Sequence, residues 1–517
     1  MAQATLFPEK PLNSRDELNA LVDRAADIIR TATDYKFILV LLLLKRMSDV
    51  WKDEFEEKKK ELLERGWDYE KAEKEAENEV YHIYNLRREL LWDRITKDLK
   101  KLPENLTNAL KEIAELNPEL KGILDRFNFL AFTSQEHREK LRMLVELFNK
   151  YNLGKHVSHD IIGDAYEHIL YRFAPSQAKQ GEVYTPREVI RLLVKILDPK
   201  PDESVYDPAC GSSGMLIESF KHVKDFYKSD DIYLYGQEYN QDIYAICKMN
   251  LLAHGITDAV IEFGDSLLYP RFKENGELKK FDVVIANPPW NQDGYGEETL
   301  KRAEFRERYS FGYPPNNSAD WAWIQHMISS AKDDTGRVGI VIDNGALFRG
   351  GKEKIIREKI LKRDLVECVI LLPEKLFYNT GAPGAIIILR KKKPEERKGK
   401  VLFINASNDY EKHPEVRKLN RLGDKHIEKI VDAYKKFKDI DGFCRVVSLE
   451  EIKENDYNLN VTLYVFPREE IEEIDIAKEW EELRKIEEEI KEVEKKIESY
   501  LEELGYGNAK DRAINRV

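Results

Sequence analysis

The residues best suited to chemistry end the stretch Asp282–Trp290, where an apolar run leads into Asn287-Pro288-Pro289-Trp290. Two consecutive prolines fix φ twice and remove two N–H donors, so neither a strand nor a helix can continue through them. We therefore expect a rigid turn at the mouth of a sheet. The side-chain carbonyl of Asn287 and the backbone carbonyl of Pro288 can each accept one N–H from an exocyclic amine, and the ring of Trp290 can stack on a base.

A loop of small residues precedes this stretch. Asp207 ends an apolar run and leads through Ala209, Gly211 and Gly214 into a helix. Strand, small-residue turn and helix in this order bind a nucleotide-like cofactor at the end of a parallel sheet, because small residues let the backbone approach the ligand. The two glycines do not form the dinucleotide fingerprint. Cys210, with no histidine placed beside it in a motif, is interpreted as a small packing residue.

The ends of two further predicted strands also carry acids. Glu238 follows the run Ile232–Gly236 and can bind both hydroxyls of a ribose. Asp265 follows Val260–Phe263, and its carboxylate can accept from a donor group of the same ligand. A single acid of this kind could be a helix cap. Four successive strand ends with functional side chains, including Asn287, are much harder to explain in that way.

Upstream, Tyr184-Thr185-Pro186 precedes an amphipathic segment, Glu188–Leu197. We expect Thr185 to cap this helix, with Pro186 at its first position. A capped helix start presents free N–H groups, which suit a carboxylate of the ligand. Tyr184 and Thr185 are therefore further candidates for the cofactor site.

The order of these motifs resembles the gamma-order N6-adenine DNA methyltransferases, which use S-adenosyl-L-methionine. Longer stretches are similar to the modification subunit of type I restriction–modification systems. The resemblance covers about residues 15–465 and is carried by Ser318–His326, Gly336–Phe348, Val369–Phe377, Thr380–Leu389 and Glu450–Asn460.

The resemblance implies an α/β, Rossmann-like methyltransferase fold with a mostly parallel sheet flanked by helices. It implies a flipped-out adenine as the methyl acceptor. The resemblance implies that Thr185 contacts the methionine end of the cofactor, Asp207 and Gly211 its central part, Glu238 its ribose and Asp265 its adenine. It implies that Asn287 and Pro288 hold the target amine. Trp290 and Phe377 would form the two walls of the base pocket. Tyr or Phe is usual in the family at the position of Trp290, so the larger ring is a departure.

The resemblance also implies partners. Two copies of such a subunit assemble with one specificity subunit that reads the DNA, and restriction subunits can join. The net charge of −12 agrees with this division, because phosphate contacts need clustered Lys and Arg, which another chain can supply.

We expect three domains: a helical domain over 1–155, the catalytic domain over 156–467 and a C-terminal helix over 468–517. The last has an apolar residue at alternating spacings of three and four, as in a coiled-coil seam. Its positions are Leu483, Ile486, Ile490, Val493, Ile497, Tyr500 and Leu504. This helix either packs on its own domain or docks on the long helices of the specificity subunit.

Composition is that of a globular protein, with 42% hydrophobic and 35% charged residues. The longest apolar run, Phe37–Leu44, is too short to cross a bilayer, and the first residues lack a signal-peptide pattern. The four cysteines are scattered, without metal-ligand spacing. We therefore expect a cytoplasmic protein without a membrane segment.

Three alternatives remain. A glutamine-N5 methyltransferase also uses Asn-Pro-Pro-aromatic, but it is shorter and lacks the N-terminal helical part. A cytosine-N4 methyltransferase commonly has Ser or Asp before the two prolines. A non-catalytic assembly subunit with the same fold is the alternative from another class, and the filled catalytic and cofactor positions argue against it. A fused restriction enzyme is disfavoured, since no nuclease motif and no target-recognition repeats are visible.

Overall fold

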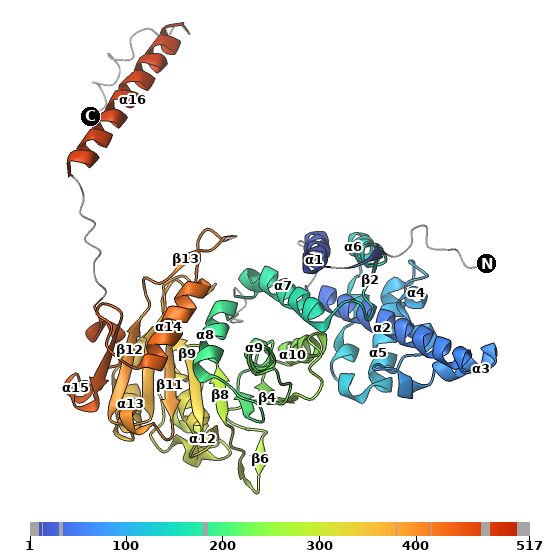
Figure 1. Cartoon of the computed structure of the whole chain (residues 1–517), viewed down its shortest axis with the longest axis horizontal. Helices are drawn as coiled ribbons and strands as arrows, with labels where there is room; N and C mark the ends of the chain where they lie inside the picture. Colours follow the sequence, from blue (N-terminus) through green and yellow to red (C-terminus); the bar gives the residue numbers. More distant parts are fainter. Residues whose placement is uncertain are drawn as a thin grey trace. The chain divides into compact units, whose positions relative to one another are not determined.

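The computed structural model of the protein describes residues 10–12, 14–29, 35–178, 185–378, 380–414, 416–466 and 476–503. The chain divides into two compact units, Met1–Phe466 and Pro467–Val517. The first unit holds a helical region and a large sheet (Figure 1). The described part of the second unit is the helix α16, Ile476–Glu503.

The first part of the chain is helical, as predicted. The apolar run Phe37–Leu44 lies inside the long helix α2, where Ile38 to Leu44 are all buried. A helix that is apolar all round must be enclosed by other elements. The helices of this region are α1 (Arg15–Ile29), α2 (Lys36–Glu64), α3 (Tyr69–Ala76), α4 (Trp92–Ile95), α5 (Leu102–Leu116), α6 (Gln135–Phe148) and α7 (His159–Ala178); a short parallel pair, β1 (Lys10–Pro11) and β2 (Tyr151–Asn152), lies among them.

A nine-stranded sheet forms the centre of the catalytic region. Two of its strands, β11 and β15, run antiparallel to their neighbours, and the other neighbouring pairs are parallel. Its order is β15 (Cys444–Ser448), β12 (Lys400–Asn405), β10 (Val366–Leu371), β11 (Gly384–Arg390), β9 (Arg337–Asp343), β8 (Val283–Ala286), β3 (Ser204–Asp207), β4 (Tyr233–Glu238) and β5 (Val260–Phe263). This order confirms the predicted α/β class with a mostly parallel sheet.

Helices cover both faces of the sheet, because its strands are apolar on both sides. Val205 points into the core shared with one set of helices and Tyr206 into the opposite core, as the alternation of a strand requires. The first set is α8 (Arg187–Leu197), α9 (Gly214–His222), α10 (Gln241–Ala253) and α14 (Asp424–Lys436); the second is α12 (Asp320–Ser330), α13 (Gly351–Lys362) and α15 (Leu449–Glu454). Shorter elements are α11 (Glu297–Leu300) and the hairpins β6–β7 (Lys273–Glu274, Glu277–Leu278) and β13–β14 (Glu411–Lys412, Asn420–Arg421).

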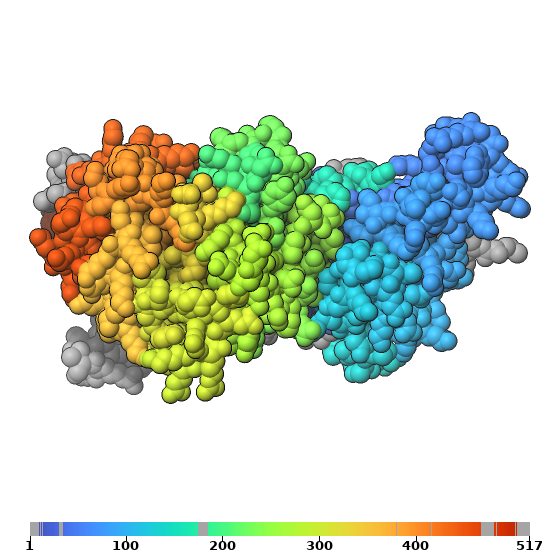
Figure 2. Space-filling view, turned by 90° about the horizontal axis from the view of Figure 1, so that it is seen from below, coloured from blue at the N-terminus to red at the C-terminus, as the bar shows by residue number. Residues whose placement is uncertain are grey.

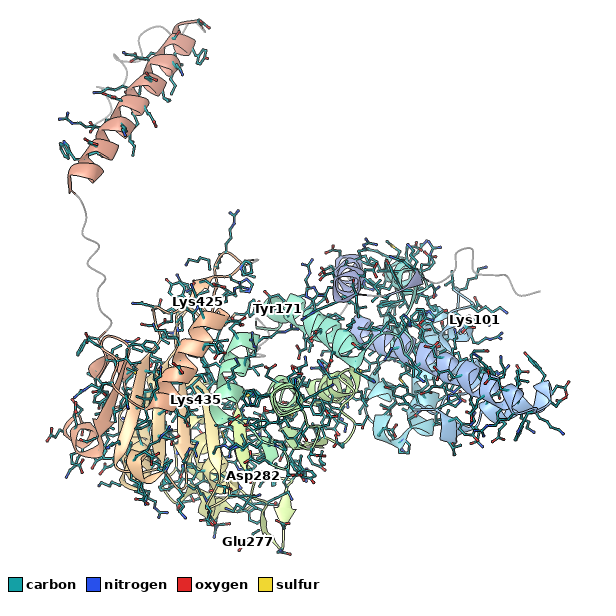
Figure 3. The ribbon with its side chains drawn as sticks, in the orientation of Figure 1. Lys101, Tyr171, Glu277, Asp282, Lys425 and Lys435 are labelled. Carbon is teal, nitrogen blue, oxygen red and sulfur yellow. The ribbon has the colours of Figure 1, made fainter. Side chains whose placement is uncertain are left out.

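The helical region and the sheet region share a core through α10. Ala245, Ile246 and Met249 belong to the apolar cluster of the helical region, whereas Cys247 and Leu251 pack on the sheet side. In the space-filling view the green residues that include α10 lie between the blue helical region and the yellow and orange part of the sheet (Figure 2). A second link is polar. Tyr171 on α7, labelled in Figure 3, lies 2.7 Å from Nε2 of His413, beside β13.

The helix α16 carries its apolar residues on the surface of its own unit. Trp480, Leu483, Ile486, Ile490, Val493, Ile497 and Tyr500 are each between 47% and 62% exposed. Among the described helices, none is both long and apolar enough to cross a membrane.

Candidate active site

The predicted strand ends meet at one edge of the sheet. β3 ends at Asp207 and β4 at Glu238, while β8 ends one residue before Asn287. Because β3, β4, β5 and β8 are parallel neighbours, their carboxyl ends lie at the same edge. After β5 the chain crosses back over β3 to form β8 on the other side. Such a reversal of strand order is where open α/β sheets bind their ligands.

A cavity of about 290 Å³ opens at this edge. Of the predicted residues, Thr185, Asp207, Ala209, Gly211, Gly214, Glu238, Asp265, Asn287 and Pro289 line it. Tyr184 lies outside the described residues. The structure therefore brings together most of the residues that the sequence singled out.

Asp207 is buried at the floor of the cavity and accepts a hydrogen bond from the Ala209 N–H at 3.0 Å. Burial raises the pKa of the Asp207 carboxyl to about 8; the Ala209 N–H opposes this rise, and the nearby Glu238 carboxylate adds to it. In the free site this carboxyl is therefore ready to lose a proton when a positive charge approaches.

Glu238 fixes the small-residue loop. Its Oε2 accepts from the Gly211 N–H at 3.0 Å, and its Oε1 accepts from the Asn240 N–H at 2.7 Å. Gly211 has φ +52°, and a Cβ built on it meets no atom within 4 Å. Glycine at 211 adopts this left-handed conformation without strain and leaves space above the loop.

The Asp265 carboxylate already accepts several hydrogen bonds within the protein, which the sequence did not indicate. Its Oδ1 accepts from the N–H groups of Leu267 and Leu268 at 2.9 and 3.0 Å, and its Oδ2 accepts from the Tyr295 hydroxyl at 2.8 Å. Burial and then the Asp265 carboxylate raise the pKa of Tyr295 well above its usual value. Tyr295 also lines the cavity, and sequence patterns gave no sign of it.

The prediction that Thr185 caps the following helix is wrong. α8 begins at Arg187, its N-cap residue is Pro186, and no side chain caps it. The Thr185 hydroxyl instead accepts a hydrogen bond from Nδ2 of Asn287 at 2.8 Å. The Thr185 hydroxyl meets Asn287 because the packing of α8 on the sheet brings Thr185 to the end of β8.

The carboxamide of Asn287 is held from both sides. While its Nδ2 donates to Thr185, its Oδ1 accepts from Nε1 of Trp290 at 2.9 Å. The ring of Trp290 meets Phe377 edge-on, with ring centroids 4.7 Å apart. A Cβ on Gly384 would lie 2.8 Å from Phe377 and 2.9 Å from Trp290, so only glycine leaves room for this pair. The two predicted walls of a base pocket are thus in contact with each other.

The residues after Trp290 complete the loop. Trp323 on α12 donates from Nε1 to the side-chain oxygen of Gln292 at 3.2 Å, and both residues line the cavity. Tyr239 also lines it. The sequence analysis did not predict Gln292, Trp323 or Tyr239 as site residues. The position of Tyr239 directly after Glu238 could have indicated that it lies at the cavity.

The cavity suits a ligand with hydroxyl groups and a positive charge. Among the described residues that line it, the acids are Glu167, Asp207, Glu238 and Asp265, and the base is Arg187. Such a lining disfavours a pyrophosphate, which would face several carboxylates. Carboxylates at strand ends accept ribose hydroxyls, and the open space over Gly211 admits close contact with a ligand. These features fit S-adenosyl-L-methionine, whose sulfonium is cationic.

Comparisons with known proteins show the family of the chain. The family described as N-6 DNA Methylase matches residues 157–473, and the HsdM N-terminal domain matches residues 18–148. The chain is 47% identical to the type I restriction enzyme MjaVIII methylase subunit of Methanocaldococcus jannaschii, over 95% of this chain and 85% of that protein. It is 48% identical to the MjaVII methylase subunit of the same organism, over 95% and 84%.

The fold is also that of a solved relative. The type I restriction-modification system methyltransferase subunit from Streptococcus thermophilus superposes with a TM-score of 0.75 at 26% identity, over 87% of this chain and 100% of that one. The chain therefore belongs to the N-6 DNA methylase family, among the methylase subunits of type I restriction enzymes, and is an adenine-specific DNA methyltransferase that uses S-adenosyl-L-methionine.

Proposed function

We propose that the carboxamide of Asn287 and the backbone carbonyl of Pro288 hold the target amine of adenine for methyl transfer. The observation that carries this proposal is the position of Asn287 at the lip of the cavity, with its carboxamide fixed by Thr185. Two acceptors draw the amine nitrogen towards a tetrahedral shape and free its lone pair. The gain comes from orientation and from stabilising a nitrogen that becomes cationic.

The bound cofactor supplies a methyl group on a sulfonium. The chain's own part would be to orient it: Asp207 and the loop from Ala209 through Gly211 to Gly214 would hold its central part, and Glu238 would accept from its ribose. Thr185 would hold its methionine end, and we assign Tyr184 to the same end from the sequence. Asp265 already accepts three hydrogen bonds, but a carboxylate oxygen has two lone pairs, so its Oδ2 can also accept from the cofactor's adenine amine.

The target base enters between Trp290 and Phe377. In the present contact of the two rings there is no gap for a base, so Trp290 has to turn away from Phe377. The same movement releases Oδ1 of Asn287 from the indole N–H. Base–aromatic stacking is worth roughly 1–3 kcal/mol, which offsets much of the cost of flipping. Pro289 keeps the turn rigid while this happens.

We also propose that the chain acts on DNA with a specificity subunit, in a complex of two methylase subunits and one specificity subunit, and that restriction subunits can join it. The exposed apolar row on α16 supports this, because a heptad-spaced row on a solvent-exposed helix is suited to pairing with partner helices. The domain limits 1–155, 156–467 and 468–517 belong to this proposal, with the last as the docking helix.

A cytoplasmic location follows from the same proposal, since the substrate is DNA. The four cysteines, Cys210, Cys247, Cys368 and Cys444, are free and buried, which suits a reducing compartment.

The test is methyl transfer from labelled S-adenosyl-L-methionine to DNA by the chain co-purified with its specificity subunit. Asn287→Ala should lower kcat by roughly a hundredfold or more, because the orienting acceptor is lost. The control is Asn108→Ala, an exposed asparagine on α5 far along the chain from the site. Full activity of Asn287→Ala would refute the assigned role, and labelled cytosine instead of adenine would favour the cytosine-N4 alternative.

A further inference from the structure

Behind the loop that carries Asn287, one arginine joins three carboxylates. Arg349 donates from Nη2 to Oδ2 of Asp320 at 2.6 Å, from Nη1 to Oδ2 of Asp343 at 2.7 Å and from Nε to Oε2 of Glu353 at 2.7 Å. The side chains of Asp320 and Glu353 are 1% and 2% exposed, so both depend on this cation. The Ser318 hydroxyl donates to Glu353 at 2.7 Å and completes the cluster.

This cluster reaches the loop through Asn291, the residue after Trp290. The Asn291 N–H donates to Oδ1 of Asp320 at 3.1 Å, and Nδ2 of Asn291 donates to Oδ2 of Asp343 at 3.3 Å. The same two carboxylates therefore hold Asn291 on one side and the planar fork of Arg349 on the other. They come from the start of α12 and the end of β9, two elements that follow one another in the chain.

Asn291 has an uncommon backbone conformation. Its φ is +52°, in the left-handed region that side chains other than glycine rarely adopt. Asparagine adopts this conformation more readily than most side chains, and contacts with the surrounding structure keep it there. Two hydrogen bonds from one residue to a fixed pair of carboxylates provide those contacts, and they do so next to the Pro-Pro turn.

We propose that Arg349 is a positioning residue for methyl transfer: through Asp320 and Asp343 it fixes Asn291 and thereby sets where Asn287 and Trp290 stand. The inference rests on the proposed role of Asn287. Arg349 does not line the cofactor cavity, whereas Asn287 does, so its loss should displace the loop without removing a cofactor contact. Burial raises the pKa of Asp320 to about 6, so this carboxylate depends on favourable partners to stay charged.

The test compares Arg349→Lys, Arg349→Met and Asp343→Asn in the complex with the specificity subunit. Lysine keeps the charge but cannot span two carboxylates with a planar fork. We expect kcat for adenine methylation to fall by roughly tenfold to a hundredfold in Arg349→Met, because small displacements at the reacting centre are costly. The KM for S-adenosyl-L-methionine should stay within about twofold. Arg349→Lys should retain part of the lost kcat.

The matched control is Arg88→Met, because Arg88 also joins two carboxylates, Glu73 and Glu77, within the helical region. It should leave kcat unchanged. Free guanidinium added to Arg349→Ala should restore part of kcat if the fork itself is needed, since the Arg349 side chain is 31% exposed and its place is reachable from solvent. Asp343→Asn tests the same path without removing the arginine, in case Arg349→Met does not fold.

The inference is overturned if the Arg349 variants and Asp343→Asn keep normal kcat. It is equally overturned if cofactor KM and thermal stability change in step with kcat, since that is the signature of general disruption. Asn287→Ala in the same assay separates the two proposals. An inactive Asn287→Ala with a fully active Arg349→Met refutes the positioning role alone, whereas an active Asn287→Ala refutes the proposed function.

Discussion

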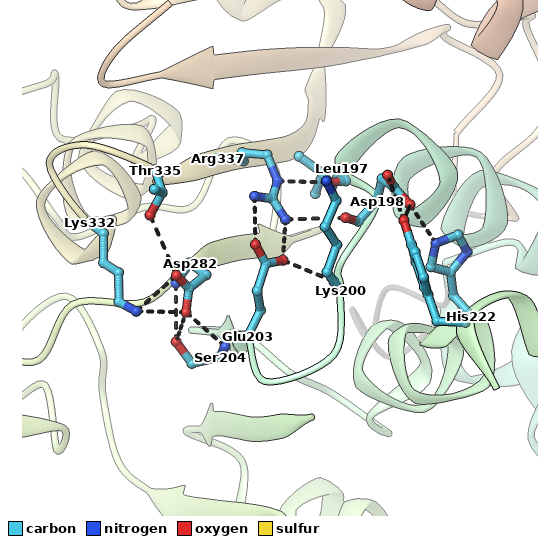
Figure 4. Close-up of polar contacts among 11 residues, drawn as sticks. Leu197, Asp198, Lys200, Glu203, Ser204, His222, Asp282, Lys332, Thr335 and Arg337 are labelled. Atoms are coloured by element: carbon cyan, nitrogen blue, oxygen red, sulfur yellow. Dashed lines mark hydrogen bonds and ion pairs between the residues drawn. The ribbon is translucent and has the colours of Figure 1, made fainter. Parts of the chain in front are cut away.

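Asp282 and Asp207 are buried carboxylates at opposite ends of neighbouring strands, and their surroundings differ. At the amino end of β8, Asp282 accepts from the N–H of Ser204 at 2.9 Å and from Nζ of Lys332 at 2.8 Å (Figure 4). Burial works against ionisation there, but the bonds from Lys332 and Ser204 outweigh it and lower the pKa of Asp282. At the carboxyl end of β3, burial raises the pKa of Asp207, and a second acid, Glu238, adds to the rise.

The same amino end anchors the helix that leads to the site. Arg337 donates from Nε to the carbonyl oxygen of Leu197 at 2.7 Å and from Nη2 to that of Asp198 at 3.2 Å, and it pairs with Glu203 (Figure 4). These carbonyls lie at the carboxyl end of α8, where a cation is stabilising. α8 is thus fixed at its far end, while Thr185, just before its start, meets Asn287.

The difference between the two ends of the strands indicates that the amino end serves stability and the carboxyl end serves ligand binding. Charges at the amino end are neutralised within the chain, so they are suited to holding the fold. None of the groups that set the pKa of Asp207 is a cation. Its ionised form therefore becomes favourable only when a positively charged ligand binds. Substitutions at the two ends should therefore fail in different assays.

Asp207→Asn should give the largest effect, and on binding. Asparagine has the same shape but cannot carry the charge that pairs with a sulfonium. A hydrogen bond or ion contact to a charged group contributes about 1.5–3 kcal/mol, so affinity for S-adenosyl-L-methionine should fall roughly tenfold to a hundredfold. Isothermal titration calorimetry of the purified chain measures this, with Asp424→Asn, an exposed carboxylate at the start of α14, as the control.

The pH dependence of the same variant tests the physical reason. At about pH 3, below the ordinary carboxyl pKa of 3.8, Asp207 is mostly protonated in both the folded and the unfolded chain, so it costs little stability. As pH rises towards the folded pKa of about 8, the unfolded chain ionises first and the folded chain loses stability; above that the cost is constant. Asp207→Asn should thus melt higher than the wild type at pH 8, and the difference should almost vanish at about pH 3. An equal difference at both values would contradict the assigned pKa.

Asp282→Asn should show the opposite pattern, with a loss of stability and normal binding. The substitution breaks the pair with Lys332 and turns an amide towards the donors of Ser204, at a cost of about 1–3 kcal/mol. Because the pKa of Asp282 is lowered, its contribution is present above the unfolded pKa and is lost as pH falls through the folded one. The melting temperature of Asp282→Asn should therefore differ from the wild type at pH 7 and converge with it in acid. A weaker affinity for the cofactor, with unchanged melting, would remove the contrast between the two ends.

Much of the site could be predicted from the sequence because its parts are local. Strand, loop and helix around Asp207, and the Pro-Pro turn after Asn287, are each decided by residues within one short segment. The parallel order of the strands then places their ends together. The cores of the helical region were also readable, since runs such as Phe37–Leu44 need burial on all sides.

What sequence patterns could not give are pairings across the fold. Thr185 and Asn287 are 102 positions apart, and their hydrogen bond depends on how α8 lies on the sheet. The capping rule for Thr185 was outweighed by that tertiary partner. Likewise Tyr295 reaches Asp265, and Arg349 reaches Asp320, from loops whose course no local preference determines.

Trp290→Phe should give the smallest effect. It tests whether the hydrogen bond from Trp290 to Asn287 must break before the target base can bind. Phenylalanine keeps a ring for stacking but lacks the indole N–H, so Oδ1 of Asn287 is no longer occupied before the base arrives. A neutral hydrogen bond contributes about 1 kcal/mol, so the KM for DNA should fall roughly threefold to fivefold while kcat stays within twofold. Methyl transfer by the assembled complex gives both values.

Trp67→Phe is the matched control for this change, because Trp67 is 45% exposed in the turn between α2 and α3 and should leave both constants unchanged. A higher KM for DNA in Trp290→Phe would mean that the larger ring matters more for stacking than its N–H does for occupying Asn287. A lower kcat would mean that the indole N–H is needed while the amine reacts. A lower kcat would thus show that the Trp290–Asn287 hydrogen bond is kept during methyl transfer, and that this part of the site, like the ion pairs at the amino end, is arranged before the ligand binds.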